Sequence, residues 1–239
     1  VAAPEHLPGV PMPGAAGVWP PEQEIVSYAD ALAAACRERG VGALLTPDLD
    51  QGWQRASSIF PATDPAQDQD RTIALALAVA NALLERGILT IASTYPGIGH
   101  AVNQADVPIP VLDMPLNALA EALYPFSEAV AQEIPGVLVG HVAVPALDRA
   151  QPQRPASLSP VLVEAVLREK WGYQGVIVAQ DVSSLPGTGA ETAVVQALRA
   201  GCDAVIVKGG DPAVLRSAVA AVETAVSVGA LSNERLADS

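Results

Sequence analysis

Lysine, histidine and cysteine are scarce in this 239-residue chain, and each scarcity narrows the range of functions. Only 13 residues are basic, two of them lysines, against 26 acidic residues, so the formal net charge is −13. Without a basic stripe to bind a phosphate backbone, we expect no nucleic-acid partner. Cys36 and Cys202 lie far apart and match neither a disulfide framework nor a zinc site. The three histidines are not at ligand spacing, so we expect no metal and no cofactor.

Long apolar runs are also missing. No run reaches the roughly 20 residues that a membrane-spanning helix needs, and the opening VAAPEHLPGVPMPG lacks the charged and apolar regions of a signal peptide. We therefore expect no membrane partner, and the compartment stays open. Half of the residues are apolar, which is enough for the core of one globular domain. We expect a single domain over residues 1–239, in which the Pro- and Gly-rich residues 1–21 form a loop or arm.

Short β-rich runs alternate with longer helical patterns, which is typical of βα units and a parallel sheet. The expected strands are GALLTPDLD, ILTIAST, GVLVGHVAV, GVIVAQDV and DAVIVKGG. Apolar residues at helical spacing predict helices over residues 25–39, 69–86, 116–134, 159–171, 189–200 and 213–228. Five such strands fit part of an eightfold barrel or an open doubly wound sheet, and periodicity leaves both open. No GxGxxG fingerprint follows a strand, which disfavours a dinucleotide fold.

Two long segments, VLVGHVAVPALD and RPASLSPVLVEAVLREKWGYQGVIVAQD, follow one another in an order that resembles the family 3 glycoside hydrolases. The resemblance is to their β-N-acetylglucosaminidase branch in particular, and LLTPDLD and YPGIG are similar to further family segments. It implies an α/β fold, a TIM-type (β/α)8 barrel with its site at the C-terminal ends of the strands. It also implies that the first three strands are absent from this chain. We expect an omitted N-terminal segment rather than a native open sheet, because an open strand edge tends to associate.

The strand GVIVAQDVS aligns with the family pattern of glycine, three apolar residues, a hydroxyl residue and the nucleophilic aspartate. On that pattern Ala179 stands at the hydroxyl position and Gln180 at the nucleophile position. An uncharged amide is a poor nucleophile, so the covalent step of a retaining glycosidase should fail. Asp181 comes next, and in a regular strand its side chain would point to the opposite face. A bulge could reorient it, but a cap or salt bridge at the strand end is the simpler expectation.

The resemblance also marks positions where family side chains have changed. The lysine and histidine that grip a sugar in the family correspond to Ser93 and Thr94, whose hydroxyls can still donate and accept hydrogen bonds. The family's later histidine corresponds to Ile98. The acid/base triplet of the family is not visible after the YPGIG segment, where the ionisable candidates are His100 and Asp106.

Two strand-end residues, Asp50 and His141, match family positions that line the sugar pocket, and either a ligand contact or a structural hydrogen bond fits both. The family's pocket arginine is not in place, although Arg55 stands a few residues earlier. The KGGDP segment after the last strand fits a phosphate-binding helix start or a plain turn with a cap.

The sequence therefore predicts a family 3 glycoside hydrolase-like domain with degraded catalytic motifs. It would bind a carbohydrate, such as one that contains N-acetylglucosamine, or a protein partner, with little or no turnover. The alternative is an active retaining β-N-acetylglucosaminidase-like hydrolase that uses Asp181 with His100 or Asp106. The sequence alone leaves open whether the chain is an enzyme, and it assigns no catalytic residue.

Overall fold

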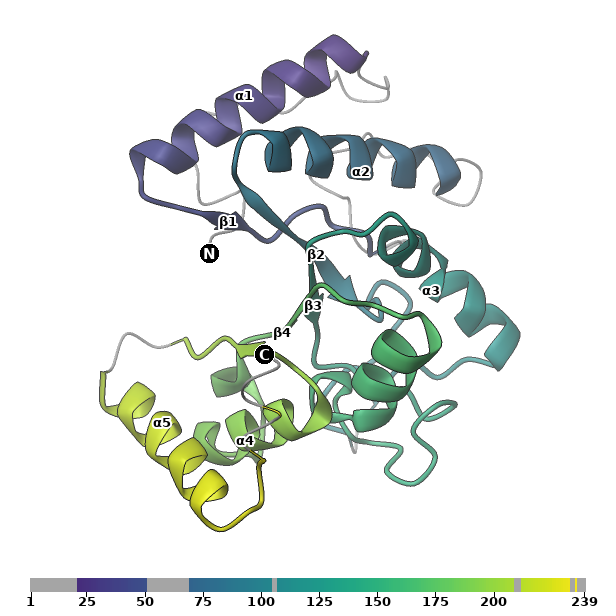
Figure 1. Cartoon of the computed structure of the whole chain (residues 1–239). Coiled ribbons are helices and arrows are strands. Elements are labelled where there is room, and N and C mark those ends of the chain that lie inside the picture. The colour runs from purple at the N-terminus through teal and green to yellow at the C-terminus, as the bar shows by residue number, and fades with distance from the viewer. Residues whose placement is uncertain (1–20, 51–68, 105–106, 209–211, 233–234, 236–239) are drawn as a thin grey trace. The chain divides into compact units, whose positions relative to one another are not determined.

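The computed structural model describes residues 21–50, 69–104, 107–208, 212–232 and 235, in which helices and short strands alternate (Figure 1). The helices and strands are α1 (Glu22–Glu38), β1 (Ala43–Leu44), α2 (Gln69–Glu85), β2 (Leu89–Tyr95), α3 (Leu116–Ala131), β3 (Gly136–Val139), η2 (Ala156–Leu158), η3 (Val161–Lys170), β4 (Val176–Ala179), η4 (Val182–Ser184), α4 (Ala190–Ala200), β5 (Ala204–Val205) and α5 (Pro212–Ser227). The elements η2 and η4 are 3-10 turns, and η3 is a wide π-type helix.

The five strands follow one another in the sheet in chain order, β1-β2-β3-β4-β5. β1 pairs with β2 in parallel, and β4 pairs with β5 in parallel. A doubly wound sheet would instead reverse its strand order at a switch point. The order therefore agrees with consecutive strands of a barrel wall and excludes the doubly wound alternative.

The chain divides into two compact units. Unit 1 consists of Val1–His100 and Ala120–Val137, and unit 2 consists of Ala101–Leu119 and Leu138–Ser239. The single domain over residues 1–239 stays a prediction, and the expected arm over residues 1–21 lies outside the described residues except for Pro21. In the described part of the chain, no helix is long and apolar enough to cross a membrane.

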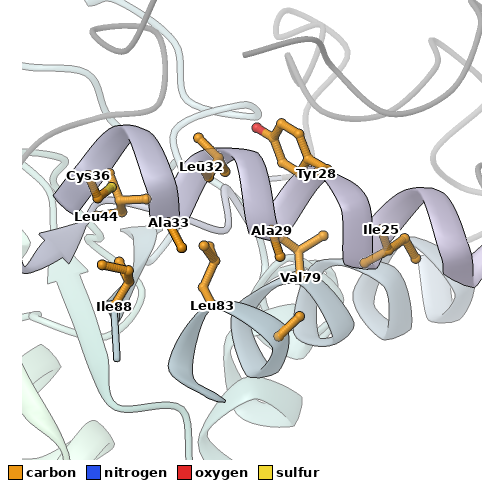
Figure 2. Packing of buried hydrophobic residues seen from close by; sticks show 11 residues of the cluster. Ile25, Tyr28, Ala29, Leu32, Ala33, Cys36, Leu44, Val79, Leu83 and Ile88 are labelled. Carbon is orange, nitrogen blue, oxygen red and sulfur yellow. The ribbon is translucent and has the colours of Figure 1, made fainter. Parts of the chain in front are cut away.

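The core of unit 1 forms where α1 packs against α2 and β1 (Figure 2). The contacting face of α1 carries apolar residues at helical spacing, including Ala29, Leu32 and Cys36, all fully buried. Leu83 of α2 and Leu44 of β1 are equally buried in the same cluster. Burial of these side chains is the main favourable contribution to holding the first βα pair together.

In unit 2, an arginine and an aspartate hold the start of β4. The Arg168 guanidinium donates through Nη1 to the backbone carbonyls of Tyr173, at 2.9 Å, and Gly175, at 2.8 Å, and it pairs through Nη2 with Asp203. Asp203 also accepts the Ile177 N–H at 2.7 Å. These contacts fix the turn that leads into β4, and so they position the residues at the other end of that strand.

Candidate functional site

The C-terminal ends of β3 and β4 bring two segments of unit 2 together. The Gln180 N–H donates to the Val139 carbonyl at 2.9 Å, and the Val182 N–H donates to the Ile206 carbonyl at 3.0 Å. In a parallel sheet these ends lie at the same edge, which is where barrel enzymes place their reactive groups. His141, Gln180 and Asp181 therefore lie at the edge where the sequence predicts a site.

Both ring nitrogens of His141 have partners. Nδ1 lies 2.8 Å from the Oγ of the fully buried Ser157, and Nε2 lies 2.9 Å from the backbone carbonyl oxygen of Asp181. A carbonyl only accepts, so Nε2 carries the proton, and in the neutral ring Nδ1 accepts from the serine hydroxyl. Burial lowers the pKa of His141 below its usual value and outweighs the opposite effect of Asp181. The histidine is thus a neutral group that links two strand ends.

Asp181 caps the short turn η4 instead of extending the strand. β4 ends at Ala179, and the Asp181 carboxylate accepts the Ser183 N–H at 3.1 Å, the Ser183 hydroxyl at 2.5 Å and the Lys208 N–H at 2.9 Å. Burial raises the pKa of this carboxyl, but the hydrogen bonds from Ser183 and Lys208 outweigh it, so the pKa is lowered overall. The carboxylate is ionised at neutral pH and holds the end of β4 against the residues that follow β5.

Gln180 lies between these two residues in the chain and is half-buried. Its backbone N–H donates to the Val139 carbonyl oxygen, whereas its side-chain amide makes no hydrogen bond to any residue in the described ranges. An amide offers one acceptor and two N–H donors but no negative charge. At this position the chain can therefore hydrogen-bond a polar ligand, but it cannot supply an anionic nucleophile.

In unit 1, Asp50 holds the PGIG turn that follows β2. Its Oδ2 accepts the Ile98 N–H at 2.9 Å, its Oδ1 accepts the Gly99 N–H at 2.8 Å, and the side chain is buried. Gly97 has φ +98°, and a Cβ on it would lie 3.2 Å from the Asp50 Oδ1. A glycine suits this position because of both the backbone conformation and the close approach of the carboxylate. Asp50 thus makes structural hydrogen bonds to this loop.

The other candidates in unit 1 differ in accessibility. Ser93 is half-buried, and its backbone pairs with Pro47 and Leu49; Thr94 is buried. His100 is exposed. Asp106, Arg55 and most of the KGGDP segment lie outside the described residues. A (β/α)8 barrel with its site at the strand ends would gather Asp50, Thr94, His141 and Gln180 around one hollow, and that gathering stays a prediction.

The sequence reasoning missed the partners of these groups. Ser157 stands in the segment RPASLSP, which carries only the family resemblance, and yet it is hydrogen-bonded to His141, 16 positions away in the sequence. Lys208 stands in the KGGDP segment, where the sequence fits a phosphate-binding helix start or a plain turn with a cap, and its N–H donates to Asp181. Ser183 had a local signal, because a serine two residues after an aspartate is typical of a side-chain-capped turn.

Among the described residues, no group of three His, Cys, Asp or Glu side chains could hold a metal ion.

Comparison with known proteins gives a consistent result. The model of the glycosyl hydrolase family 3 N-terminal domain matches residues 22–239. The β-hexosaminidase of Methylobacillus flagellatus is 30% identical over 182 residues, which cover 73% of this chain and 50% of the relative. The β-hexosaminidase of Chromobacterium violaceum is 31% identical over 188 residues, 77% of this chain and 51% of the relative. The chain therefore spans about half the length of these curated relatives.

Solved structures show the same fold. A family 3 glycosyl hydrolase from Mycobacterium smegmatis superposes with a TM-score of 0.77 at 27% identity, covering 92% of this chain and 67% of the other. A family 3 β-N-acetylglucosaminidase from Paenibacillus gives a TM-score of 0.78 at 23% identity, covering 91% and 42%. The prediction of an α/β fold of the TIM-barrel type is confirmed.

Proposed function

Because the chain belongs to the glycosyl hydrolase family 3 N-terminal domain family, we propose that it binds a carbohydrate with little or no hydrolytic turnover. The names of its relatives, β-hexosaminidase and β-N-acetylglucosaminidase, favour a ligand that contains an N-acetylated amino sugar. The chain spans about half the length of those curated relatives, so a ligand class is proposed from their names and not their whole activity.

The observation that carries the proposal is the state of the two residues after β4. Gln180 stands at the nucleophile position of the family pattern and has no charge, while the neighbouring Asp181 carboxylate accepts three hydrogen bonds from Ser183 and Lys208. A retaining glycosidase needs a carboxylate that can approach the anomeric carbon of the sugar. In this chain the three hydrogen bonds all go to Oδ1 of Asp181 and hold its carboxylate as the cap of η4.

A general acid is equally hard to assign at the described strand ends. A retaining mechanism needs one group that gives a proton and later takes one back. His141 is neutral, and both of its ring nitrogens are hydrogen-bonded within the protein. Among the described residues at these strand ends, Gln180 can therefore offer hydrogen bonds to sugar hydroxyls, whereas His141 is not available for the proton transfer that cleavage needs.

One observation favours the alternative of an active hydrolase. The lowered pKa of Asp181 keeps this carboxylate ionised at neutral pH, as a nucleophile must be. On that alternative, Asp181 would act with His100 or Asp106 as the acid/base group. Binding of a protein partner would also fit the proposed lack of turnover. That role predicts no saturable response to a sugar.

Titration with N,N′-diacetylchitobiose, followed by nuclear magnetic resonance of the full chain, tests the binding role. We expect saturable binding, with an affinity about tenfold weaker in Gln180→Ala, because the variant loses the amide hydrogen bonds. The matched control is Gln132→Ala, at an exposed position after α3. No saturable binding, or binding equally insensitive to both substitutions, would overturn the assignment of the sugar site to Gln180.

A further inference from the structure

A second concave site in unit 2 is formed by the loop before η2 and by α4. It is a cleft of about 810 Å³, lined among others by Gln151, Arg154, Thr188, Gln196 and Arg199, and we call it the arginine cleft. That volume lies within the range of small-molecule sites. Its lining does not include His141, Gln180 or Asp181.

The charge of the arginine cleft is opposite to that of the chain. Among the described residues that line it, two are arginines and none is a carboxylate, although the sequence has twice as many acidic as basic residues. Gln151, Gln196 and Thr188 add neutral donors and acceptors, and Pro152, Pro155 and Leu158 add apolar surface. A basic, partly apolar hollow on an acidic protein favours a ligand that carries a negative group.

Gln151 and Asp148 hold the Arg154 guanidinium in place through contacts with its Nε atom. Its Nε donates to the Gln151 Oε1 at 3.2 Å and lies 3.6 Å from the Asp148 Oδ2. Asp148 is buried and is fixed in turn by the Ser159 hydroxyl at 2.7 Å. These contacts use the Nε side of the guanidinium, and its two Nη groups have no hydrogen-bond partner within the described part of the chain.

Arg199 gives the cleft a positive charge that no described carboxylate neutralises through an ion pair. It is exposed on the last turn of α4, and it forms no ion pair or hydrogen bond with any of the described residues. Asp148 offsets part of the Arg154 charge, so Arg199 determines the preference of the cleft for an anion. A guanidinium presents paired N–H donors whose geometry matches the two oxygens of a carboxylate or phosphate.

We propose that the arginine cleft binds a small ligand through an oxyanion group, a carboxylate or a phosphate. Arg199 and the Nη groups of Arg154 contact the oxyanion. Gln151, Gln196 and Thr188 hydrogen-bond the polar remainder of the ligand, and the prolines contact its apolar part. The site is independent of the sugar site at Gln180, so either one can fail without the other.

The test is a pair of titrations of the full chain, with inorganic phosphate and with succinate, at constant ionic strength, followed by amide resonances. We expect saturable shifts at Thr188 and Gln196 with at least one probe. The affinity should be at least about tenfold weaker in Arg199→Gln, because a charge-assisted contact is lost. Arg216→Gln makes the same charge change at an exposed position on α5 and should alter the affinity less than about twofold.

The two probes separate the sources of the oxyanion. Response to succinate alone identifies a carboxylate ligand, and response to phosphate alone identifies a phosphorylated one; both support the proposal. No saturable shift at Thr188 or Gln196 with either probe overturns it. Equal weakening in Arg199→Gln and Arg216→Gln also overturns it, because binding would then follow net charge and not the cleft. Circular dichroism of both variants verifies that they fold.

Discussion

The Nε2 atom of His141 donates a hydrogen bond to the backbone carbonyl oxygen of Asp181 at 2.9 Å. The histidine therefore binds the main chain beside the nucleophile position, and it does not contact the Asp181 carboxylate through any hydrogen bond of the described structure. The ring positions the backbone on which Gln180 and Asp181 stand. In this chain the strand-end histidine is a structural link between β3 and β4.

Replacement of His141 by glutamine should flatten the dependence of stability on pH. Burial lowers the pKa of His141 in the folded state below the value of 6.5 that applies to the unfolded chain. As the pH falls below 6.5, the unfolded chain binds the proton more readily, so the wild type loses free energy of unfolding, by at most about 1.4 kcal/mol per pH unit. Above that pH the effect vanishes. Urea unfolding at pH 7 and pH 5 measures it, and equal losses in the two proteins would contradict the prediction.

Removal of the Asp181 carboxylate should destabilise unit 2. Asp181→Ala leaves the Ser183 and Lys208 N–H groups without their acceptor, and the expected loss of unfolding free energy is about 1–2 kcal/mol. Asp181→Asn is the matched control, because an amide oxygen still accepts and asparagine caps about as well, so most of the stability should remain. Denaturant unfolding at pH 7 compares the three proteins, and an unchanged midpoint in Asp181→Ala would show that the cap is unimportant.

Most of the fold could be predicted from the sequence because its signals are local. Pro160 and Pro212 mark helix starts and the glycines mark ends, and each expected helix begins and ends within three residues of an observed one. The strands were predicted too long. Pro47 has no N–H for the ladder, so β1 ends at Leu44 and continues only as a single bridge between Asp48 and Ser93.

The candidate site was less predictable, because its hydrogen bonds depend on tertiary packing. The residues were found through family positions, but that pattern says nothing about what each side chain contacts. His141 and Asp181 are 40 positions apart, and Asp181 and Lys208 are 27 apart. The cap from Asp181 to Ser183 spans only two positions, and the sequence expectation of a cap at this strand end agrees with it.

The core between α1 and α2 should be sensitive to truncation at Leu83. This side chain is fully buried against α1, and Leu83→Ala should lower the unfolding free energy by about 2–5 kcal/mol, because it removes apolar contacts and leaves a cavity. Leu84→Ala, at the adjacent and 44% exposed position, should change it by less than about 0.5 kcal/mol. Similar losses in both variants, measured by thermal or denaturant unfolding, would contradict the packing shown in Figure 2.

Restoration of a carboxylate at the family's nucleophile position should not restore activity. In Gln180→Asp, Ser93 and Thr94 still stand where the family has the lysine and histidine that bind the sugar, and both ring nitrogens of His141 are still hydrogen-bonded within the protein. Catalytic groups that act as a unit lose nearly all of their effect when one member is missing. Steady-state hydrolysis of a chromogenic N-acetylglucosaminide should stay at background in this variant. Measurable hydrolysis would show that the rest of the catalytic apparatus is intact.

The most direct test of the account is the turnover of a chromogenic N-acetylglucosaminide by the wild-type chain, compared with Asp181→Ala and with Asp113→Ala, which removes an exposed carboxylate. We expect no hydrolysis above background in any of the three proteins, because Gln180 cannot act as the nucleophile and the Asp181 carboxylate is engaged as a cap. A wild-type rate that persists in Asp113→Ala and disappears in folded Asp181→Ala would contradict it, and would identify Asp181 as the nucleophile of an active glycosidase.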